Sequence, residues 1–337
     1  MVKDFSFQWH ITDLCNLRCR HCYQDRFDKE RELPVEDCER IISDMVTSLE
    51  VSGYESLSIN ITGGEPLISP LLYPILDLLE RIDFIKELNI ITNGLALKSS
   101  YPILKGYKKL KYIKVSLEGS TEEMNDSIRG KGNFKRVIEN IKDFTDDVIL
   151  MFTLTSYNYR ELNDMYNLAD FLNVRGFILE RFIPLGTGRG MADKVLKLDE
   201  WLYVLNIISD WLDISLEYLI PYKAFFIDLK EDDILGALCN LGDESMCLMP
   251  DGIVYPCRRL PVPVGDLKRD SFDRVLRELK FFKERINRSI LKGKCGHCQL
   301  DGCIGCRALA YATSGDIYSE DKQCPKDRYG RITLEAK

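Results

Sequence analysis

The chain has 337 residues, 45% of them hydrophobic, which is enough to bury one large core and a smaller second one. Its net charge of −7 argues against a nucleic-acid partner, which usually binds a basic surface. No signal-peptide pattern opens the chain, and no apolar run approaches the roughly 20 residues of a membrane-spanning helix, so we expect a cytoplasmic protein with no membrane partner.

Strand-like and helix-like segments alternate over the first 185 residues. We expect strands at 5–12, 56–62, 88–92, 112–118, 148–155 and 176–184. Helices are expected between them, with clear patterns at 35–49, 71–81, 134–144 and 159–172. This alternation predicts an α/β fold with a parallel sheet and external helices. Six units fall short of the eight in a closed barrel, so we expect a partial (β/α)6 barrel.

Three of these strands alternate polar and apolar residues, whereas parallel strands covered on both faces are usually apolar throughout. Alternation with period two places the polar side chains on one face. We therefore expect a polar barrel lumen; the alternative is an antiparallel sheet with one wet face, which the intervening helices disfavour. The polar sets are Gln8, His10 and Thr12, then Ser58, Asn60 and Thr62, then Lys114, Ser116 and Glu118.

The second half of the chain changes character. A helix is expected at 196–213, followed by a connecting segment at 214–238. From Cys239 onward we expect short turns, proline-rich stretches and a dense group of cysteines. The expected domains are therefore 1–213 for the barrel, 214–238 for the connection and 239–337 for the cysteine-rich region.

The chain has 12 cysteines, and clustered thiols in a cytosolic protein more often bind metal than form disulfides. Three lie between Cys15 and Cys22, and eight lie between Cys239 and Cys324. Cys38 stands alone in an expected helix and is interpreted as a small buried hydrophobic residue. The sequence therefore predicts two separate metal regions.

The first region is a Cys-x3-Cys-x2-Cys motif formed by Cys15, Cys19 and Cys22. Iron–sulfur clusters usually take four cysteines, so three thiolates would leave one iron of a [4Fe–4S] cluster open for another ligand. A zinc site that recruits His21 is the alternative. The motif resembles that of the radical S-adenosylmethionine (SAM) superfamily, with His21 where an aromatic residue is usual.

The resemblance continues in order along the strands. It implies that Gly63, Gly64 and Glu65, which precede Pro66, bind the methionine amino group, and Glu65 has a carboxylate that can accept hydrogen bonds from an ammonium group. It also implies that Ser116 and Glu118 bind the ribose hydroxyls, although aspartate is usual where Glu118 stands, and that Arg129 lies near cofactor or substrate. The glycine-rich stretch 184–190 lacks phosphate-loop spacing and is expected to be a flexible loop flanking the adenosine pocket.

The second region resembles the SPASM extension of peptide-modifying members, which holds two auxiliary [4Fe–4S] clusters. The resemblance implies a first set of Cys239, Cys257 and Cys306 and a second set of Cys295, Cys298, Cys303 and Cys324. The spacings x4 and x2 replace the usual x5 and x3. Cys247, beside an expected hairpin turn at 250–252, is either a fourth ligand of the first auxiliary cluster or a buried thiol. A zinc ribbon is the alternative for the stretch 295–306.

These features predict a radical SAM enzyme that reductively cleaves SAM to a 5′-deoxyadenosyl radical, which takes hydrogen from a substrate. The resemblance implies a peptide substrate, modified oxidatively or epimerised, and a flavodoxin or ferredoxin as electron donor. The first strand begins near residue 5 and leaves no room for a leader-binding domain, so we expect a separate leader-recognition protein or none.

Two alternatives remain. The spacing of Cys303, Cys306 and Arg307 also resembles enzymes that modify heme or tetrapyrrole side chains. A zinc-binding regulatory or scaffold protein is the alternative from another functional class. Within the expected lumen, the candidate substrate contacts are His10, Lys114, Glu180 and Arg181, although polar packing would explain these residues equally well.

Overall fold

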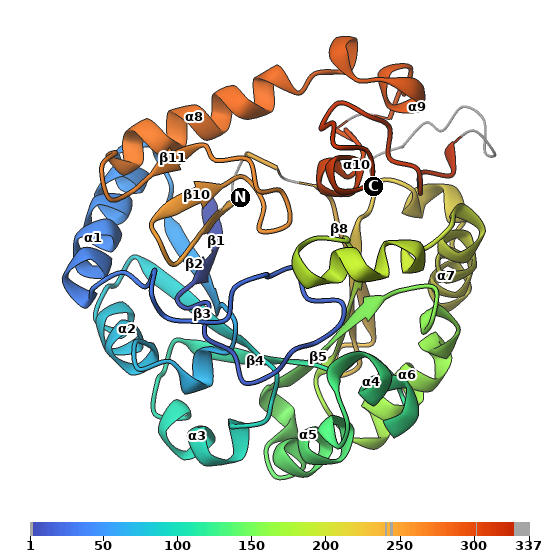
Figure 1. Cartoon of the computed structure of the whole chain (residues 1–337), viewed down its shortest axis with the longest axis horizontal. Helices are drawn as coiled ribbons and strands as arrows, with labels where there is room; N and C mark the ends of the chain where they lie inside the picture. The colour runs from blue at the N-terminus through green and yellow to red at the C-terminus, as the bar shows by residue number, and fades with distance from the viewer. Residues whose placement is uncertain (1–2, 240, 243–244, 301, 327–337) are drawn as a thin grey trace.

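The computed structural model describes residues 3–239, 241–242, 245–300 and 302–326. Its centre is a curved, open sheet with the strand order β11-β10-β9-β1-β2-β3-β4-β5-β6-β7-β8 (Figure 1). The six expected strands pair in parallel and in chain order, which confirms the partial barrel. They are β1 (Asp4–His10), β2 (Ser56–Thr62), β3 (Ile85–Thr92), β4 (Leu110–Ser116), β5 (Val148–Leu154) and β6 (Gly176–Arg181).

Helices surround this sheet on its outer side (Figure 1). In the barrel part of the chain they are α1 (Val35–Val51), α2 (Leu72–Glu80), α3 (Leu97–Leu104), α4 (Glu122–Arg129), α5 (Asn133–Ile141), α6 (Leu162–Phe171) and α7 (Leu198–Leu212). Two short helices, α3 and α4, were not among the sequence predictions. Among the described residues, no helix combines the length and the apolar character that crossing a bilayer would require.

The alternation along β1 explains the two faces of the sheet. Phe5 and Phe7 are buried on the helix side, and the ring of Phe5 packs edge-on against Phe272. The polar residues that alternate with these phenylalanines face inward. Gln8 on β1 and Asn60 on β2 are register partners there, and both line an internal cavity. The expected polar lumen is therefore present.

The segment after α7, expected only to connect two domains, extends the sheet. It forms β7 (Ala224–Asp228), antiparallel to β6, and β8 (Asp233–Ala237), antiparallel to β7. At the opposite end of the sheet, β9 (Ser245–Leu248) pairs in parallel with β1. The hairpin expected around residues 250–252 joins β9 to β10 (Ile253–Tyr255), which pairs with β11 (Gly265–Asp266).

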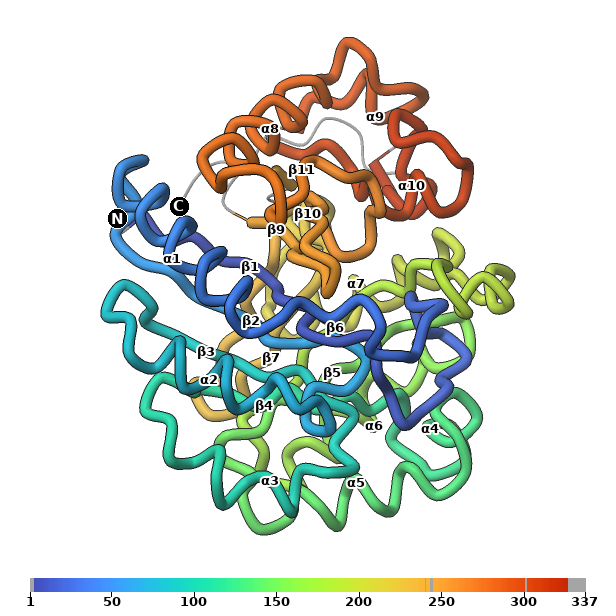
Figure 2. The backbone as a smooth tube through the Cα atoms, turned by 60° about the vertical axis from the view of Figure 1, so that its left-hand side comes forward, coloured from blue at the N-terminus to red at the C-terminus, as the bar shows by residue number. Residues whose placement is uncertain are grey.

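The C-terminal region gathers at one end of the molecule, beside β1 (Figure 2). The expectation of short turns, proline-rich stretches and dense cysteines missed the 14-residue helix α8 (Phe272–Arg285) in this region. Ser271 caps that helix, and its apolar face packs in the main core and against α1. Two shorter helices follow, α9 (Gly293–Gly296) and α10 (Arg307–Ser314).

Candidate active site

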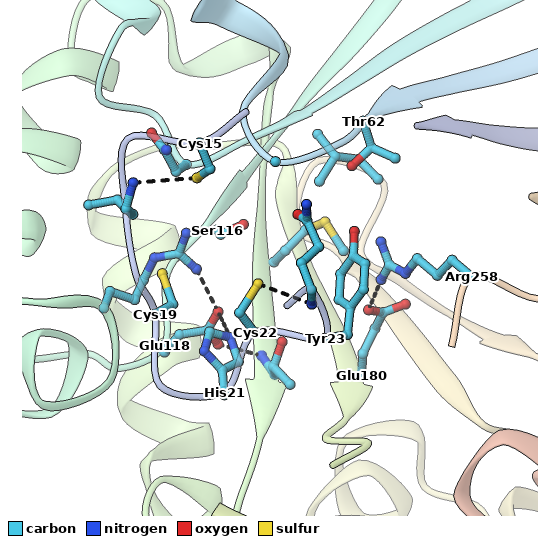
Figure 3. Close-up of a pocket in the computed structure, with 18 of the residues that line it drawn as sticks. Cys15, Cys19, His21, Cys22, Tyr23, Thr62, Ser116, Glu118, Glu180 and Arg258 are labelled. Atoms are coloured by element: carbon cyan, nitrogen blue, oxygen red, sulfur yellow. Dashed lines mark hydrogen bonds and ion pairs between the residues drawn. The ribbon is translucent and has the colours of Figure 1, made fainter. Parts of the chain in front are cut away.

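A cavity opens at the C-terminal ends of the six parallel strands. This is the edge where barrel enzymes place their chemistry. The residues that line it include Cys15, Cys19, Cys22, Gly63, Gly64, Ser116, Glu118 and Arg129. Figure 3 shows the three thiols with Ser116 and Glu118 around this space. The structure thus brings together residues from the three sequence motifs of the barrel.

The cysteine loop (residues 12–24) is fixed to the turn after β2 by backbone hydrogen bonds. Gly64 donates to the carbonyl of Thr12 at 2.8 Å, and Glu65 donates to the carbonyl of Leu14 at 2.8 Å. A Cβ on Gly64 would lie only 2.3 Å from the Leu14 carbonyl oxygen. Glycine is therefore required here because loop and turn are in backbone contact.

Burial raises the pKa of Cys15, and it raises the pKa of Cys22 to about 11. The free thiols are therefore protonated at neutral pH, and metal binding would release those protons. Within the described part of the chain, no three His, Cys, Asp or Glu side chains converge on one metal ion. A cluster spreads its cysteine ligands over several irons, so it requires no such convergence.

The carboxylate of Glu65 is not directed into the cavity. It is fully buried and accepts hydrogen bonds from the Thr92 hydroxyl at 2.6 Å and from the backbone amides of Asn93 and Leu67 at 2.6 and 3.0 Å. Glu65 thus braces the ends of β2 and β3, while Gly63 and Gly64 line the cavity. The expected contact of Glu65 with an ammonium group stays a prediction.

The buried carboxylate of Glu118 holds the side chains of Arg129 and His21 in place. One carboxylate oxygen contacts Arg129 at 2.9 Å and His21 at 3.0 Å, and the other accepts the Thr153 amide at 2.8 Å. Burial acts to raise the pKa of Glu118, but the charges and hydrogen bonds of these neighbours outweigh it and lower the pKa. Glu118 therefore links the motif histidine of the cysteine loop to the strand ends.

The side chains present fit a cofactor that carries a carboxylate and hydroxyl groups. The Nε of Arg129 is buried with no hydrogen-bond partner among the described residues, although Arg129 lines the cavity beside the three cysteines. An unpaired guanidinium N–H at this place would suit the carboxylate of SAM. The three thiols, the glycine turn and Ser116 line the same cavity, where an iron–sulfur cluster and SAM would find further contacts.

The expectation that the stretch 184–190 is a flexible loop is wrong, because residues Gly186–Lys194 form two short 3₁₀ segments separated by a kink at Met191. Thr187 donates to the Gln24 carbonyl at 2.9 Å, and Gly188 donates to the Cys22 carbonyl at 2.8 Å. Gly186, with a φ of 53°, lies against the backbone of Tyr23 and Gln24. The segment therefore supports the cysteine loop from behind, and its glycines permit this close packing.

The candidate substrate contacts occupy different environments. His10 is fully buried and its Nε2 lies 3.1 Å from the Tyr23 hydroxyl; burial, aided by Arg258, lowers the pKa of His10 to about 3. Lys114 donates to Asn60 at 2.7 Å, and burial lowers its pKa to about 8. Glu180 lines the cavity and pairs with two arginines described below.

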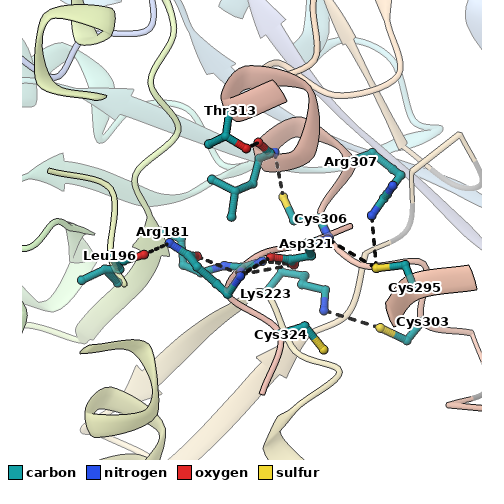
Figure 4. A network of polar contacts seen from close by, with 12 residues as sticks. Arg181, Leu196, Lys223, Cys295, Cys303, Cys306, Arg307, Thr313, Asp321 and Cys324 are labelled. Atoms are coloured by element: carbon teal, nitrogen blue, oxygen red, sulfur yellow. Dashed lines mark hydrogen bonds and ion pairs between the residues drawn. The ribbon is translucent and has the colours of Figure 1, made fainter. Parts of the chain in front are cut away.

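Arg181 is directed toward the C-terminal region. It is buried and donates to Gln323 at 3.0 Å and to Asp321 at 3.3 Å (Figure 4). Asp321 in turn accepts the amide of Cys306 at 2.9 Å, and its own amide contacts the Cys295 sulfur at 3.4 Å. Arg181 thus ties β6 to the cysteine-rich region, a placement that favours a structural role.

The C-terminal cysteines lie in two groups. Burial is the main cause that raises the pKa of Cys239 to about 12, and the neighbouring thiols of Cys306 and Cys257 raise it further. The second group surrounds a small cavity and consists of Cys295, Cys298, Cys303 and Cys324. These are the two sets that the SPASM resemblance implies. Cys247 lies buried on β9, close enough to Cys257 to interact electrostatically, and its ligation stays a prediction.

Several residues of the site were not predicted. Tyr23, Arg258 and Arg259 line the cavity, and Lys223 donates to the Cys303 sulfur at 3.6 Å (Figure 4). The sequence signal for these residues was the adjacent pair Arg258 and Arg259 directly after Cys257. That this pair reaches the cavity of the barrel is evident only from the tertiary structure.

Comparisons with known proteins agree with this arrangement. Residues 9–169 match the Radical SAM superfamily, and residues 239–299 match SPASM, an iron-sulfur cluster-binding domain. The chain is 28% identical to an AdoMet-dependent heme synthase of Methanosarcina barkeri, over 94% of this chain and 95% of that protein. It is also 28% identical to the mycofactocin maturase MftC of Mycobacterium ulcerans, over 97% and 89%. Its fold resembles the crystal structure of Streptococcus suis SuiB bound to precursor peptide SuiA, with TM-score 0.69, 17% identity and coverage of 96% and 76%.

Proposed function

We propose that this chain is a radical SAM enzyme that modifies a ribosomally made peptide, by oxidation or epimerisation. The proposal is supported by the matches of residues 9–169 to the Radical SAM superfamily and of residues 239–299 to SPASM. When bound, a [4Fe–4S] cluster with SAM supplies a 5′-deoxyadenosyl radical that removes hydrogen from the substrate. The matches to an enzyme superfamily and to an iron-sulfur cluster-binding domain argue against the zinc-binding scaffold as an interpretation of the cysteines.

The observation that carries the proposal is the convergence of the motifs in one cavity. Cys15, Cys19 and Cys22 would hold the cluster. Gly63 and Gly64 line the same cavity, and their close contact with the backbone of residues 12–14 fixes the turn beside the cysteine loop. Arg129 would orient the SAM carboxylate, and Ser116 a ribose hydroxyl. The apolar side chains of Met151, Phe182 and Ile183 line the same cavity and would exclude water from a reactive intermediate.

The proposed enzyme also holds two auxiliary [4Fe–4S] clusters. The first would be held by Cys239, Cys257 and Cys306, and the second by Cys295, Cys298, Cys303 and Cys324. Around the second set, Lys223 and Arg307 place cations within 3.6 Å of thiol sulfurs, as suits thiolate ligands. These clusters would accept an electron from the substrate, and a flavodoxin or ferredoxin would supply the initiating electron.

The peptide assignment is supported by the relatives. Mycofactocin maturase is named for maturation, and the structural neighbour SuiB binds a precursor peptide. The second candidate is a heme or tetrapyrrole side-chain modifier, which the AdoMet-dependent heme synthase favours at the same identity and nearly the same coverage. The spacing of Cys303, Cys306 and Arg307 supports that candidate as well.

The cofactor part is tested by changing Cys15, Cys19 and Cys22 together to alanine. Reconstituted wild type should be brown, hold about twelve irons per chain and release 5′-deoxyadenosine under anaerobic reduction. The triple variant should lose about four irons and all SAM cleavage. Cys38→Ala, a change to a buried thiol in α1, is the matched control and should retain both. Parent-like cleavage by the triple variant would overturn the proposal.

The substrate part is tested with the peptide encoded by a small open reading frame beside the gene, compared with coproporphyrin. Peptide maturation predicts a change in the mass of the peptide that depends on SAM and reductant. Turnover of coproporphyrin alone would instead establish the tetrapyrrole candidate.

A further inference from the structure

Two cavities meet at a pair of adjacent arginines. The first is the cavity of the cysteine loop, and the second is lined by Gln8, Asn60, Cys239 and Cys257, among others. Arg258 and Arg259 line both of them, and no other residue does so within the described part of the chain. The pair therefore lies where a substrate between the SAM site and the first auxiliary set would have to sit.

A tight turn presents both side chains to this boundary. Cys257 and Leu260 form an isolated β-bridge, and the Leu260 amide donates to the Cys257 carbonyl at 2.9 Å. Arg258 and Arg259 are thus the two central residues of a hydrogen-bonded four-residue turn. The guanidinium of Arg258 also lies 5.6 Å from the ring centre of Tyr23, which restrains it further. The pair is held in place before any ligand binds.

One carboxylate serves both cations. Glu180 contacts Arg258 at 2.5 Å through one oxygen and Arg259 at 3.3 Å through the other (Figure 3 shows the first pair). Arg259 additionally donates to the Arg181 carbonyl at 3.1 Å. Each guanidinium has five N–H donors, so the hydrogen bonds formed with other described residues leave several donors available. The trio has an excess positive charge, and Lys114 lies near enough to Glu180 and Arg258 to interact electrostatically with both.

We propose that Arg258 and Arg259 bind a carboxylate of the peptide substrate at the boundary of the two cavities. The occupant must be anionic and planar to use two guanidinium forks, which is the geometry that a carboxylate offers. This inference rests on the proposed peptide function and specifies which group of the peptide is recognised. Glu180 then acts as an internal anion that competes with the peptide carboxylate for the two arginines.

The test measures binding to the reconstituted holoenzyme by fluorescence anisotropy, independently of turnover. The probe is a labelled synthetic peptide with the sequence of the neighbouring small open reading frame. It is compared with a form that is amidated at the C-terminus and carries Asn and Gln in place of Asp and Glu. Arg259→Gln is the chosen variant because Arg259 is the more exposed of the pair. Arg277→Gln, which alters an exposed ion pair on α8, is the control.

We expect Arg259→Gln to weaken binding of the carboxylate peptide by about ten-fold or more and to leave binding of the neutral form unchanged. Glu180→Gln should act in the opposite direction and retain or strengthen binding, because it removes the competing anion. If the arginines had only a structural role, or only balanced the charge at Cys257, Arg259→Gln and Glu180→Gln would weaken binding of both peptide forms to the same extent. That result, or an unaffected Arg259→Gln variant, would overturn the inference even while the wild type still modifies the peptide.

Coproporphyrin, whose propionates are also carboxylates, separates this inference from the proposed function. Binding of coproporphyrin that depends on Arg259, with no binding of either peptide, would support the carboxylate site and overturn the peptide assignment. Failure of all three probes to bind would overturn both.

Discussion

Replacing Gly64 by alanine should slow SAM cleavage by about a hundred-fold while leaving the barrel folded. The backbone φ of Gly64 is not in the left-handed region, so the effect of the new methyl group is purely steric. Its Cβ would lie 2.3 Å from the Leu14 carbonyl oxygen and 2.6 Å from that of Asp13. Both atoms belong to backbone, which cannot rotate away as a flexible side chain would.

The size of the effect follows from this geometry. The contact with Leu14 falls short of the 3.0 Å floor for such contacts by about 0.7 Å, so the cysteine loop must move away from the turn. The movement would break the hydrogen bonds that Gly64 and Glu65 donate to this loop, each contributing about 1 kcal/mol. A shift approaching 1 Å in the position of reacting groups costs about a hundred-fold in rate.

The assay is anaerobic formation of 5′-deoxyadenosine by reconstituted protein with dithionite, together with iron content and circular dichroism. Gly190→Ala is the matched control, since its Cβ would meet no atom within 4 Å in a segment that also supports the cysteine loop. The control should behave as wild type. Parent-like cleavage by Gly64→Ala would refute the reasoning, because the contact between turn and loop would then not set the position of the thiols.

Three further predictions concern buried charges. Glu118→Gln should lower the free energy of unfolding by about 3 kcal/mol in denaturant titrations, because it leaves the buried Arg129 without its anion; an unchanged transition would contradict this. Lys114 has its pKa lowered to about 8 by burial, so its folded state binds the proton less tightly than the unfolded state. The difference in the free energy of unfolding between the wild type and Lys114→Met should therefore rise by about 1 kcal/mol from pH 7 to pH 9. A difference that does not change with pH would argue against burial of the Lys114 cation. The Arg307→Lys variant should hold about four irons fewer after reconstitution, because the Arg307 guanidinium donates to the Cys295 sulfur and to two backbone carbonyls. A full iron content would show that these hydrogen bonds are not needed for cluster binding.

The parts of the fold that sequence reasoning predicted are those with local signals. Period-two polar alternation in β1, β2 and β4 was enough to predict the lumen, and the cysteine spacings were enough to predict which thiols lie together. Helix α8 also had local signals, namely a capping Ser271 and apolar residues at helical spacing from Val275 to Phe282. They were overlooked because the surrounding cysteines and prolines suggested irregular structure.

The rest depended on contacts between distant segments. Glu180 and Arg258 are 78 residues apart, and their pairing requires β6 and the turn after β10 to meet. The internal role of Glu65 was hidden for a similar reason, since its partners Thr92 and Asn93 lie at the end of the next strand. A motif indicated which residues matter at that turn, but not which of their atoms face the cavity.

The parallel pairing of β9 with β1 has a consequence for engineering. A β1 stripped of β9 would present an open edge with unpaired backbone groups, which invites association with other chains. Exchange of cysteine-rich regions between related enzymes should therefore place the junction before β9 and keep the register in which Gln8 faces Cys247. A graft that omits β9 would leave this edge of β1 open.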